Sequence, residues 1–345
     1  MPTDPLIGTP YRALRELGRG GMGEVFEAEH VALAKRVVVK VLHKHLSLRA
    51  DQVSRVLLEG QALAHLSHPN IVAVTDLQIT PDGRPYLVME RLAGRTLREE
   101  REARRFLPVE EAVAITRQAL AGLGAAHDAG IVHRDVKLDN IFLCAPTEPA
   151  APRLVKLLDF GLAKVLESRR EGAPLPLPVG TEEGVMLGTP RFFSPEQATF
   201  GPVDQRTDVY AMGIVLYTLV AGRGPFEHLS TVLDLLQAHA WTEPAPPSSY
   251  APQFIPPELE EAIRKALAKR PVDRFPSASS FADALGLAVR PLPRWASTEP
   301  LPEGVVADAS APRRRRWVHT EPMPTLRVPS APDNPDEPPD PTEPR

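Results

Sequence analysis

The sequence predicts an α+β protein in which a small antiparallel β-sheet lobe plus one helix lies over a larger, mainly helical lobe. Residues 11–42 alternate short β-branched runs with glycines, a pattern typical of a twisted hairpin followed by a third strand. Beyond about residue 92 the apolar residues recur at helical spacing. Strands that come first in the chain and helices that come later indicate an α+β fold.

The small lobe, about residues 11–91, continues with one helix and two strands. Residues 49–66 carry apolar side chains at helical spacing. Residues 71–77 and 86–89 are short apolar runs that favour strands. Residues 1–10 are predicted to form an N-terminal extension.

The large lobe, about residues 92–288, is predicted to be helical apart from one strand over residues 154–158. Pro108 can begin a long helix and Gly130 can end it. Later helices are predicted over four segments: residues 207–220, 232–239, 259–267 and 277–287.

Composition narrows the class of protein. The chain has 345 residues, 43% of them hydrophobic, and a formal net charge of -4, a balance that argues against nucleic-acid binding. Cys144 is the single cysteine, so no internal disulfide can form and a reducing compartment is favoured. The N-terminus lacks a signal segment, and the most apolar run, residues 209–220, is too short to span a bilayer. We therefore expect a cytoplasmic protein without a transmembrane segment, in which this run is a core helix.

Residues 289–345 form a proline-rich tail. They hold 14 of the 39 prolines, a density that excludes helices and sheet interiors and predicts an extended, disordered segment. Residues 294–302 and 316–324 both read Arg-Trp-x-x-Thr-Glu-Pro-x-Pro. A tryptophan in such a stretch can anchor in a pocket of a partner protein, so the repeat is a candidate docking motif. Repetition by drift in a compositionally biased linker is an equal alternative.

Two segments carry the groups that phosphoryl transfer needs. Residues 133–140 read His-Arg-Asp-Val-Lys-Leu-Asp-Asn, which brings together a carboxylate, a lysine and an amide at Asp135, Lys137 and Asn140. The tripeptide Asp159-Phe160-Gly161 follows after a strand-sized gap. This chemistry requires a base for a hydroxyl, a cation for the moving phosphoryl group and hard oxygen ligands for Mg²⁺.

Further candidate residues precede these two segments along the chain. Residues 18–25 read Gly-Arg-Gly-Gly-Met-Gly-Glu-Val, Lys40 ends an all-valine run, and Glu59 follows nineteen residues later. With the two segments above, this order resembles the eukaryotic-like (Hanks-type) serine/threonine protein kinases of bacteria. The resemblance covers about residues 11–287, and the kinase-like domain is expected to span residues 11–288. It implies the bilobal protein-kinase-like fold, ATP with Mg²⁺ (or Mn²⁺) as cofactors, and the serine and threonine hydroxyls of proteins as substrates.

The resemblance implies a role for each of these side chains. Asp135 would orient the substrate hydroxyl and accept its proton. Lys137, typical of the serine/threonine-specific members, would stabilise charge on the moving phosphoryl group. Lys40 would contact the α- and β-phosphates of ATP and pair with Glu59. The implied metal ligands are Asn140 and Asp159.

The implied nucleotide pocket departs from the family pattern at two positions. Val38 stands where the family usually has alanine, and Phe142 stands beneath the adenine where leucine is common. The added bulk predicts weaker ATP binding or a pocket of different shape. The other residues expected around the nucleotide are Gly18, Gly20, Gly23, Val25 and Met89, with Glu90 and Leu92 bonding adenine through their backbone.

Arg134, which directly precedes the catalytic aspartate, predicts control by phosphorylation of the activation loop. Arg55 and Lys164 stand at positions where the family pattern implies that they lie near Arg134. Three cations that converge in this way form a phosphate pocket. Thr181 is the only hydroxyl residue of residues 170–186 and is the predicted phosphosite, with an unmodified loop residue as the alternative. Candidate autophosphorylation sites in the tail are Thr298 and Thr320.

Four more residues at positions that match the family pattern are expected to support the structure of the large lobe. Thr189 is expected to contact Asp135, and Glu196 is expected to form a buried ion pair with Arg274. Asp208 completes this structural set.

The sequence leaves two hypotheses of different functional classes. The first is an active kinase, and the second is a catalytically weak nucleotide-binding scaffold that recruits partners through its tail. An inactive relative normally lacks one of the residues with catalytic and metal roles, and all of them are present here, so an active kinase is favoured. Transfer to small molecules is a weaker third hypothesis, because residues 188–190 and 194–196 resemble a platform for protein substrates.

Overall fold

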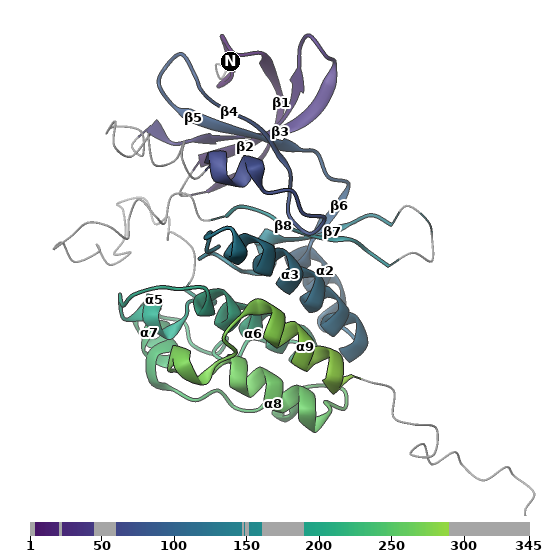
Figure 1. Cartoon of the computed structure of the whole chain (residues 1–345), viewed down its shortest axis with the longest axis vertical. Helices are drawn as coiled ribbons and strands as arrows, with labels where there is room; N and C mark the ends of the chain where they lie inside the picture. Colours follow the sequence, from purple (N-terminus) through teal and green to yellow (C-terminus); the bar gives the residue numbers. More distant parts are fainter. Residues whose placement is uncertain are drawn as a thin grey trace, which may run out of the picture. The chain divides into compact units, whose positions relative to one another are not determined.

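The computed structural model describes residues 4–20, 23–44, 60–146, 148, 152–160 and 190–289. Within these ranges the N-terminal part is a five-stranded sheet and the C-terminal part is mainly helical (Figure 1). The predicted α+β fold, with an antiparallel sheet lobe and a helical lobe, is confirmed. The proline-rich tail and its repeat lie outside the described residues.

The sheet of the small lobe has the order β1-β2-β3-β5-β4, and all neighbouring strands are antiparallel. Its strands are β1 (Tyr11–Gly20), β2 (Gly23–His30), β3 (Lys35–Leu42), β4 (Val74–Ile79) and β5 (Pro85–Glu90). Because side chains alternate across a strand, Val37, Val39 and Val41 share one face. There they join a buried core with Phe26 and Tyr86. The opposite face of β3 therefore carries Val38 and Lys40.

The segment predicted as an N-terminal extension contributes to this core. Leu6 is fully buried in the same cluster as the β3 valines. A turn holds it there, in which Leu6 N donates to Asp4 Oδ1 and Thr9 N donates to Leu6 O. Residues 4–10 are thus part of the small lobe.

The helix predicted over residues 49–66 is described only from residue 60, and residues 60–65 are helical. Gly60 lies against β4, because a Cβ there would come within 2.5 Å of Leu77 Cδ2. The strand predicted over residues 71–77 begins later, at Val74, and Ile71 makes only an isolated bridge to Leu157.

A second, three-stranded sheet joins the two parts of the chain. It consists of β6 (Gly94–Thr96), β7 (Ile141–Cys144) and β8 (Val155–Leu157), in that order and antiparallel. Only β8 was predicted, since strands of three or four residues are too short to show a periodic pattern. The short 3-10 helix Leu138–Asn140 leads directly into β7.

The large lobe is built around α6 (Arg206–Ala221), in which every residue after Arg206 is buried. A helix that is apolar on all sides belongs in a core, as predicted for residues 209–220. Gly213 lets α8 approach α6, because a Cβ there would lie 3.0 Å from Ala266 Cβ. The other helices are α2 (Leu97–Arg104), α3 (Val109–Asp128), α5 (Pro195–Ala198), α7 (Val232–Trp241), α8 (Pro257–Ala266) and α9 (Ala278–Ala288).

Among the described residues, no helix has both the length and the apolar character needed to cross a membrane.

Candidate active site

Asp208, in the first turn of α6, holds the backbone of the loop that follows α3. Its two oxygens accept hydrogen bonds from the backbone nitrogens of His133 and Arg134, each at 2.8 Å. His127 Nε2 lies 2.8 Å from Asp208 Oδ2, and a carboxylate only accepts, so the imidazole is the donor. Arg134 has a left-handed φ of 62°, and its carbonyl accepts from Gln197 Nε2 at 2.9 Å. The loop is thus fixed by the buried Asp208 of α6 and the half-buried Gln197 of α5.

The Asp135 carboxylate is oriented by two side chains of its own loop. Lys137 Nζ lies 2.8 Å from Asp135 Oδ2, and Asn140 Nδ2 donates to the same oxygen at 3.0 Å and to the Asp135 carbonyl at 2.9 Å. The sequence brings these three residues together within six positions, and the turn Leu138–Asn140 closes the contact. A carboxylate held in this way can accept a proton from a hydroxyl placed against it.

His133 links this loop to the end of β8. The ring is fully buried, and burial lowers the pKa of its imidazole, which is therefore neutral near pH 7. Its Nε2 lies 2.9 Å from the Leu158 carbonyl and must donate, so Nδ1 is left to accept from Asp135 N at 3.3 Å. The ring also packs on Phe160, with 4.5 Å between centroids. His133 carried no assigned role in the sequence, because burial of a motif histidine is visible only in the fold.

The strand β8 brings Asp159 to Lys40 of β3. Lys40 Nζ lies 3.0 Å from Asp159 Oδ1, which joins the two lobes across residues far apart in the sequence. Asp159 has a φ of 48°, a left-handed conformation that costs energy in a residue other than glycine. Such strain persists where surrounding contacts impose it, and the hydrogen bond from Leu158 N to Asn140 O at 2.8 Å is one of them.

Asn140 and Asp159 fit the metal that the fold implies. Asn140 uses its amide nitrogen on Asp135, so its Oδ1 is the side-chain atom left to bind a metal ion. A carboxylate oxygen and an amide oxygen are hard donors of the kind that Mg²⁺ takes, with water and phosphate oxygens completing its shell.

Four of the residues expected around the nucleotide, Val25, Val38, Lys40 and Met89, share one face of the small-lobe sheet. The register opposes Val25 to Lys40, Lys40 to Leu87, and Val38 to Met89. Residues directly opposite in antiparallel strands project to the same side. These four side chains therefore line the face opposite to the valine core. Met89 is buried and Val38 is half-buried.

The three glycines of β1 and β2 differ in what surrounds them. A Cβ added at Gly18 or Gly20 would meet no atom of the described chain within 4 Å. At Gly23 it would lie 2.3 Å from the carbonyl oxygen of Val41. Gly23 is thus required by the packing of β2 on β3, whereas open space next to Gly18 and Gly20 leaves room for a phosphate near the backbone.

This contrast predicts that two alanine substitutions affect different properties, one the stability of the fold and the other the binding of ATP. Gly23→Ala should lower the free energy of unfolding by about 1–3 kcal/mol, because the new methyl group overlaps the backbone of β3. Gly20→Ala should leave that free energy within about 0.5 kcal/mol and weaken ATP binding instead. Urea unfolding and a fluorescent-nucleotide titration measure the two effects. A stable Gly23→Ala variant would contradict the packing argument.

Phe142 is accommodated by a glycine that the sequence did not single out. Gly94 begins β6 opposite Cys144, and a Cβ there would lie 2.9 Å from Phe142 Cε1 and 2.1 Å from the Leu143 carbonyl. Its φ of 143° also favours glycine. The bulk of Phe142 is therefore matched by the missing side chain of Gly94.

Glu90 anchors the connection between the lobes through its side chain. Its Oε1 accepts from Ala73 N at 2.8 Å and lies 2.8 Å from Lys156 Nζ. Lys156, in β8, also donates to the Ile71 carbonyl at 3.2 Å. The sequence assigned only the backbone of Glu90 and Leu92 to adenine. It missed Lys156, because one lysine in a short strand carries no signal. Leu92 is half-buried in the same connection.

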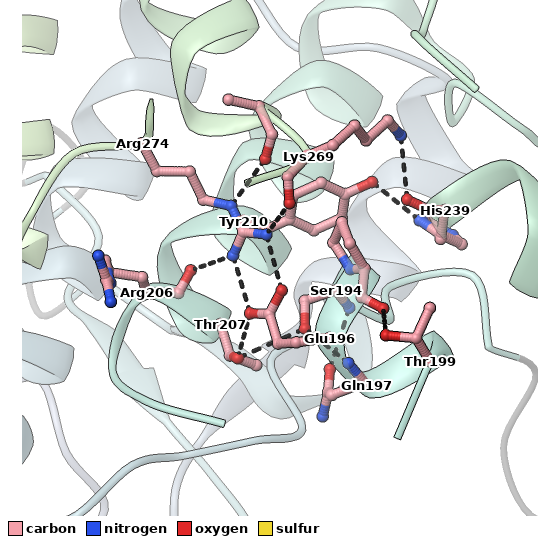
Figure 2. A network of polar contacts seen from close by, with 12 residues as sticks. Ser194, Glu196, Gln197, Thr199, Arg206, Thr207, Tyr210, His239, Lys269 and Arg274 are labelled. Atoms are coloured by element: carbon pink, nitrogen blue, oxygen red, sulfur yellow. Dashed lines mark hydrogen bonds and ion pairs between the residues drawn. The ribbon is translucent and has the colours of Figure 1, made fainter. Parts of the chain in front are cut away.

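Arg274 and Glu196 form a buried pair that braces the large lobe (Figure 2). The guanidinium makes two bonds to Glu196, at 2.8 and 2.7 Å, and Glu196 also accepts from Thr207 Oγ1 at 2.5 Å. Burial by itself would raise the pKa of Glu196, but the Arg274 guanidinium outweighs it and holds that pKa below its usual range. The carboxylate is therefore charged at neutral pH. It sits in α5, immediately before the segment that leads to Asp208.

Several predicted residues lie outside the described residues. They are Arg55, Glu59, Lys164, Thr181 and Thr189. The pairing of Lys40 with Glu59, the phosphate pocket and the contact of Thr189 with Asp135 therefore stay predictions.

The sheet lobe, the helical lobe and the group around Asp135 and Asp159 are those of a two-lobed protein kinase. Residues 11–284 match the family described as protein kinase domain, and the chain belongs to this family. The predicted resemblance to Hanks-type bacterial serine/threonine kinases is confirmed by its relatives.

The relatives are named as serine/threonine-protein kinases. The chain is 40% identical over 312 residues to Pkn1 of Myxococcus xanthus, covering 90% of this chain and 43% of that protein. It is 37% identical to PknA of Mycobacterium tuberculosis, covering 88% and 66%. The crystal structure of the Mycobacterium tuberculosis PknI kinase domain is similar with a TM-score of 0.61 and 26% identity, covering 81% of this chain and 96% of that one. The chain spans 43% and 50% of the length of the two Myxococcus xanthus relatives Pkn1 and pkn3.

Proposed function

We propose that the protein transfers the γ-phosphoryl group of ATP to serine and threonine hydroxyls of proteins. The observation that carries the proposal is the arrangement of two carboxylates. Asp135 is held by Lys137 and Asn140, and Asp159 is brought to Lys40 across the lobes.

Each of these groups has a place in the reaction. Asp135 orients the acceptor hydroxyl and takes its proton as the new oxygen–phosphorus bond forms and the bond to the β-phosphate oxygen breaks. Lys137 lies beside that carboxylate and neutralises charge on the transferred group. Lys40 binds phosphate oxygens from the sheet face. Mg²⁺, which Asn140 and Asp159 would hold, supplies further charge neutralisation when bound.

An assay with labelled ATP tests the function. Incorporation into serine or threonine of a protein substrate, dependent on Mg²⁺ and abolished by EDTA, is the expected result. Manganese is expected to replace magnesium in part, because it takes the same oxygen ligands. Nucleotide binding without incorporation would support the alternative of a nucleotide-binding scaffold that recruits partners through its tail.

The regulatory proposal is that phosphorylation of Thr181 activates the protein. Of the three residues predicted to form the phosphate pocket, only Arg134 lies within the described residues. Its backbone is held on one side by Asp208 and on the other by Gln197. A fixed backbone limits where the guanidinium can reach, so a phosphate that pairs with it would order the loop that carries Thr181.

Mapping of phosphosites after incubation with ATP tests this regulation and the tail together. Phosphate is expected at Thr181, and at Thr298 and Thr320 of the repeated motif. Thr181→Ala should lower the rate of substrate phosphorylation, whereas Thr298→Ala should not. An active protein without phosphate at Thr181, and with full rate in Thr181→Ala, would contradict the regulatory proposal. A chain ending at residue 290 that keeps every substrate and partner would contradict the docking role of the tail.

A further inference from the structure

A small cavity of about 50 Å³ lies beside the catalytic loop. Its wall includes Leu138, which directly follows Lys137. An extended chain spans at most about 3.6 Å per residue, so Leu138 lies within about 11 Å of Asp135. When a substrate hydroxyl reaches Asp135, residues within about three positions of the acceptor are therefore close enough to reach this cavity. The remaining apolar wall is formed by Phe192, Ile214, Pro225, Phe226 and Leu235.

The charged residues around the cavity are Arg98, Arg101, Arg191 and Glu227. Arg98 makes a bidentate pair with Asp139, through Nε and through Nη2 at 2.7 Å. Arg101 Nη2 lies 3.1 Å from Glu227 Oε2, and that oxygen also accepts a backbone N–H at 2.8 Å. Arg191 reaches only the backbone oxygen of Glu227, at 3.3 Å, and no carboxylate in the described part of the chain pairs with it.

We propose that this cavity selects substrates with an acidic residue within about three positions of the acceptor, and that Arg191 binds its carboxylate. The inference rests on the proposed kinase function. An acidic side chain meets Arg191, with which no carboxylate of the described residues pairs. A basic side chain would face three arginines and two carboxylates that are already paired, so the same arrangement disfavours it.

The size of the cavity bears on which acidic side chain it suits. A cavity that holds a benzene ring measures about 150 Å³. The volume of about 50 Å³ is well below that, and it suits the short aliphatic stem of glutamate better than an aromatic ring. The apolar wall suits that stem, while the arginines at the rim suit its carboxylate.

Peptide kinetics test the proposal on the full-length chain. The probes are threonine peptides with neutral flanks that carry one glutamate, glutamine or lysine at each position from four before to four after the acceptor. At the position that reaches Arg191, glutamate should raise kcat/KM about threefold to tenfold over glutamine, and lysine should lower it. The change should lie in KM, because the contact is equally present before and during transfer.

Two variants and one control attribute the effect to Arg191. Arg191→Gln should remove the preference for glutamate at that position, and Arg191→Glu should reverse it in favour of lysine. Arg264→Glu changes an exposed arginine of α8 that pairs with Glu261, and it should leave the scan as in the wild type.

The two ways of failing are distinguishable. Incorporation into the neutral peptide together with a flat scan would overturn the inference and leave the kinase function standing. A preference for glutamate that persists in Arg191→Glu would also overturn it. Absence of incorporation into every peptide and protein would overturn the proposed function and this inference with it.

Discussion

Asp135→Asn is expected to lower the rate of phosphoryl transfer by a factor on the order of 10² to 10⁴, the usual contribution of a positioned base. The amide has the shape of the carboxylate but cannot accept the hydroxyl proton. It also loses the charge that pairs with Lys137 at 2.8 Å. The loss should lie in kcat, with ATP affinity within about threefold of the wild type, because Asp135 is not among the residues of the nucleotide face.

Initial rates with labelled ATP, together with a nucleotide titration, measure this result. Asp273→Asn is a matched control, since Asp273 is an exposed aspartate of the same lobe whose carboxylate lies 3.6 Å from Arg270. The control should keep full rate. An Asp135→Asn variant with wild-type kcat would show that another group accepts the proton.

Arg274→Met is expected to lower the free energy of unfolding by about 3–5 kcal/mol at pH 7, because it leaves the Glu196 carboxylate buried without its cation. Arg274 uses all five of its N–H donors. Two go to Glu196, and three go to the carbonyls of Arg206, Ala268 and Lys269 at 2.8 to 3.0 Å. Figure 2 shows these bonds converging on the guanidinium. Arg274→Lys should recover little, because an ammonium group cannot make a planar, bidentate contact.

The pH dependence gives an independent readout of the same pair. The pKa of Glu196 is lowered in the folded protein, so its contribution to stability is present above the unfolded-state pKa of about 4.3 and is lost as the pH falls through the folded pKa. In Arg274→Met burial acts without the guanidinium and raises that pKa. The deficit of the variant should therefore be smaller at pH 5 than at pH 7, because the raised pKa favours the uncharged form of the buried Glu196 carboxyl as the pH falls.

Urea unfolding at pH 7 and pH 5 measures both effects. Glu196→Gln combined with Arg274→Met should be more stable than Arg274→Met alone, because it removes the unpaired charge. The control is Arg264→Met, which removes an exposed ion pair with Glu261 and should cost less than about 1 kcal/mol. An Arg274→Met variant as stable as this control would refute the bracing role of the pair.

Much of the site could be predicted from order and spacing along the chain. Asp135, Lys137 and Asn140 lie within six residues, so their contact depends on one local turn. The face shared by Val25, Val38 and Lys40 follows from strand alternation once the strands are assigned. Such local relations can be predicted from the sequence alone.

The unpredicted elements share a physical cause. Strands β6 and β7 have three and four residues and show no period of their own. The two strands pair closely because Gly94 has no side chain and can approach Leu143 and Phe142. Likewise Leu6 joins the small-lobe core through a turn that composition does not reveal.

The sequence by itself determined the fold class, the family and the identity of the groups proposed to carry the chemistry, because those depend on residue type, order and short-range periodicity. Only the tertiary structure decided what each group contacts. It set the neutral tautomer of His133, the three donors around Asp208, the tie between Glu90 and Lys156, and the unequal pairing of Arg98, Arg101 and Arg191. Such properties depend on burial and on distances between residues tens of positions apart, and those distances exist only once the chain has packed.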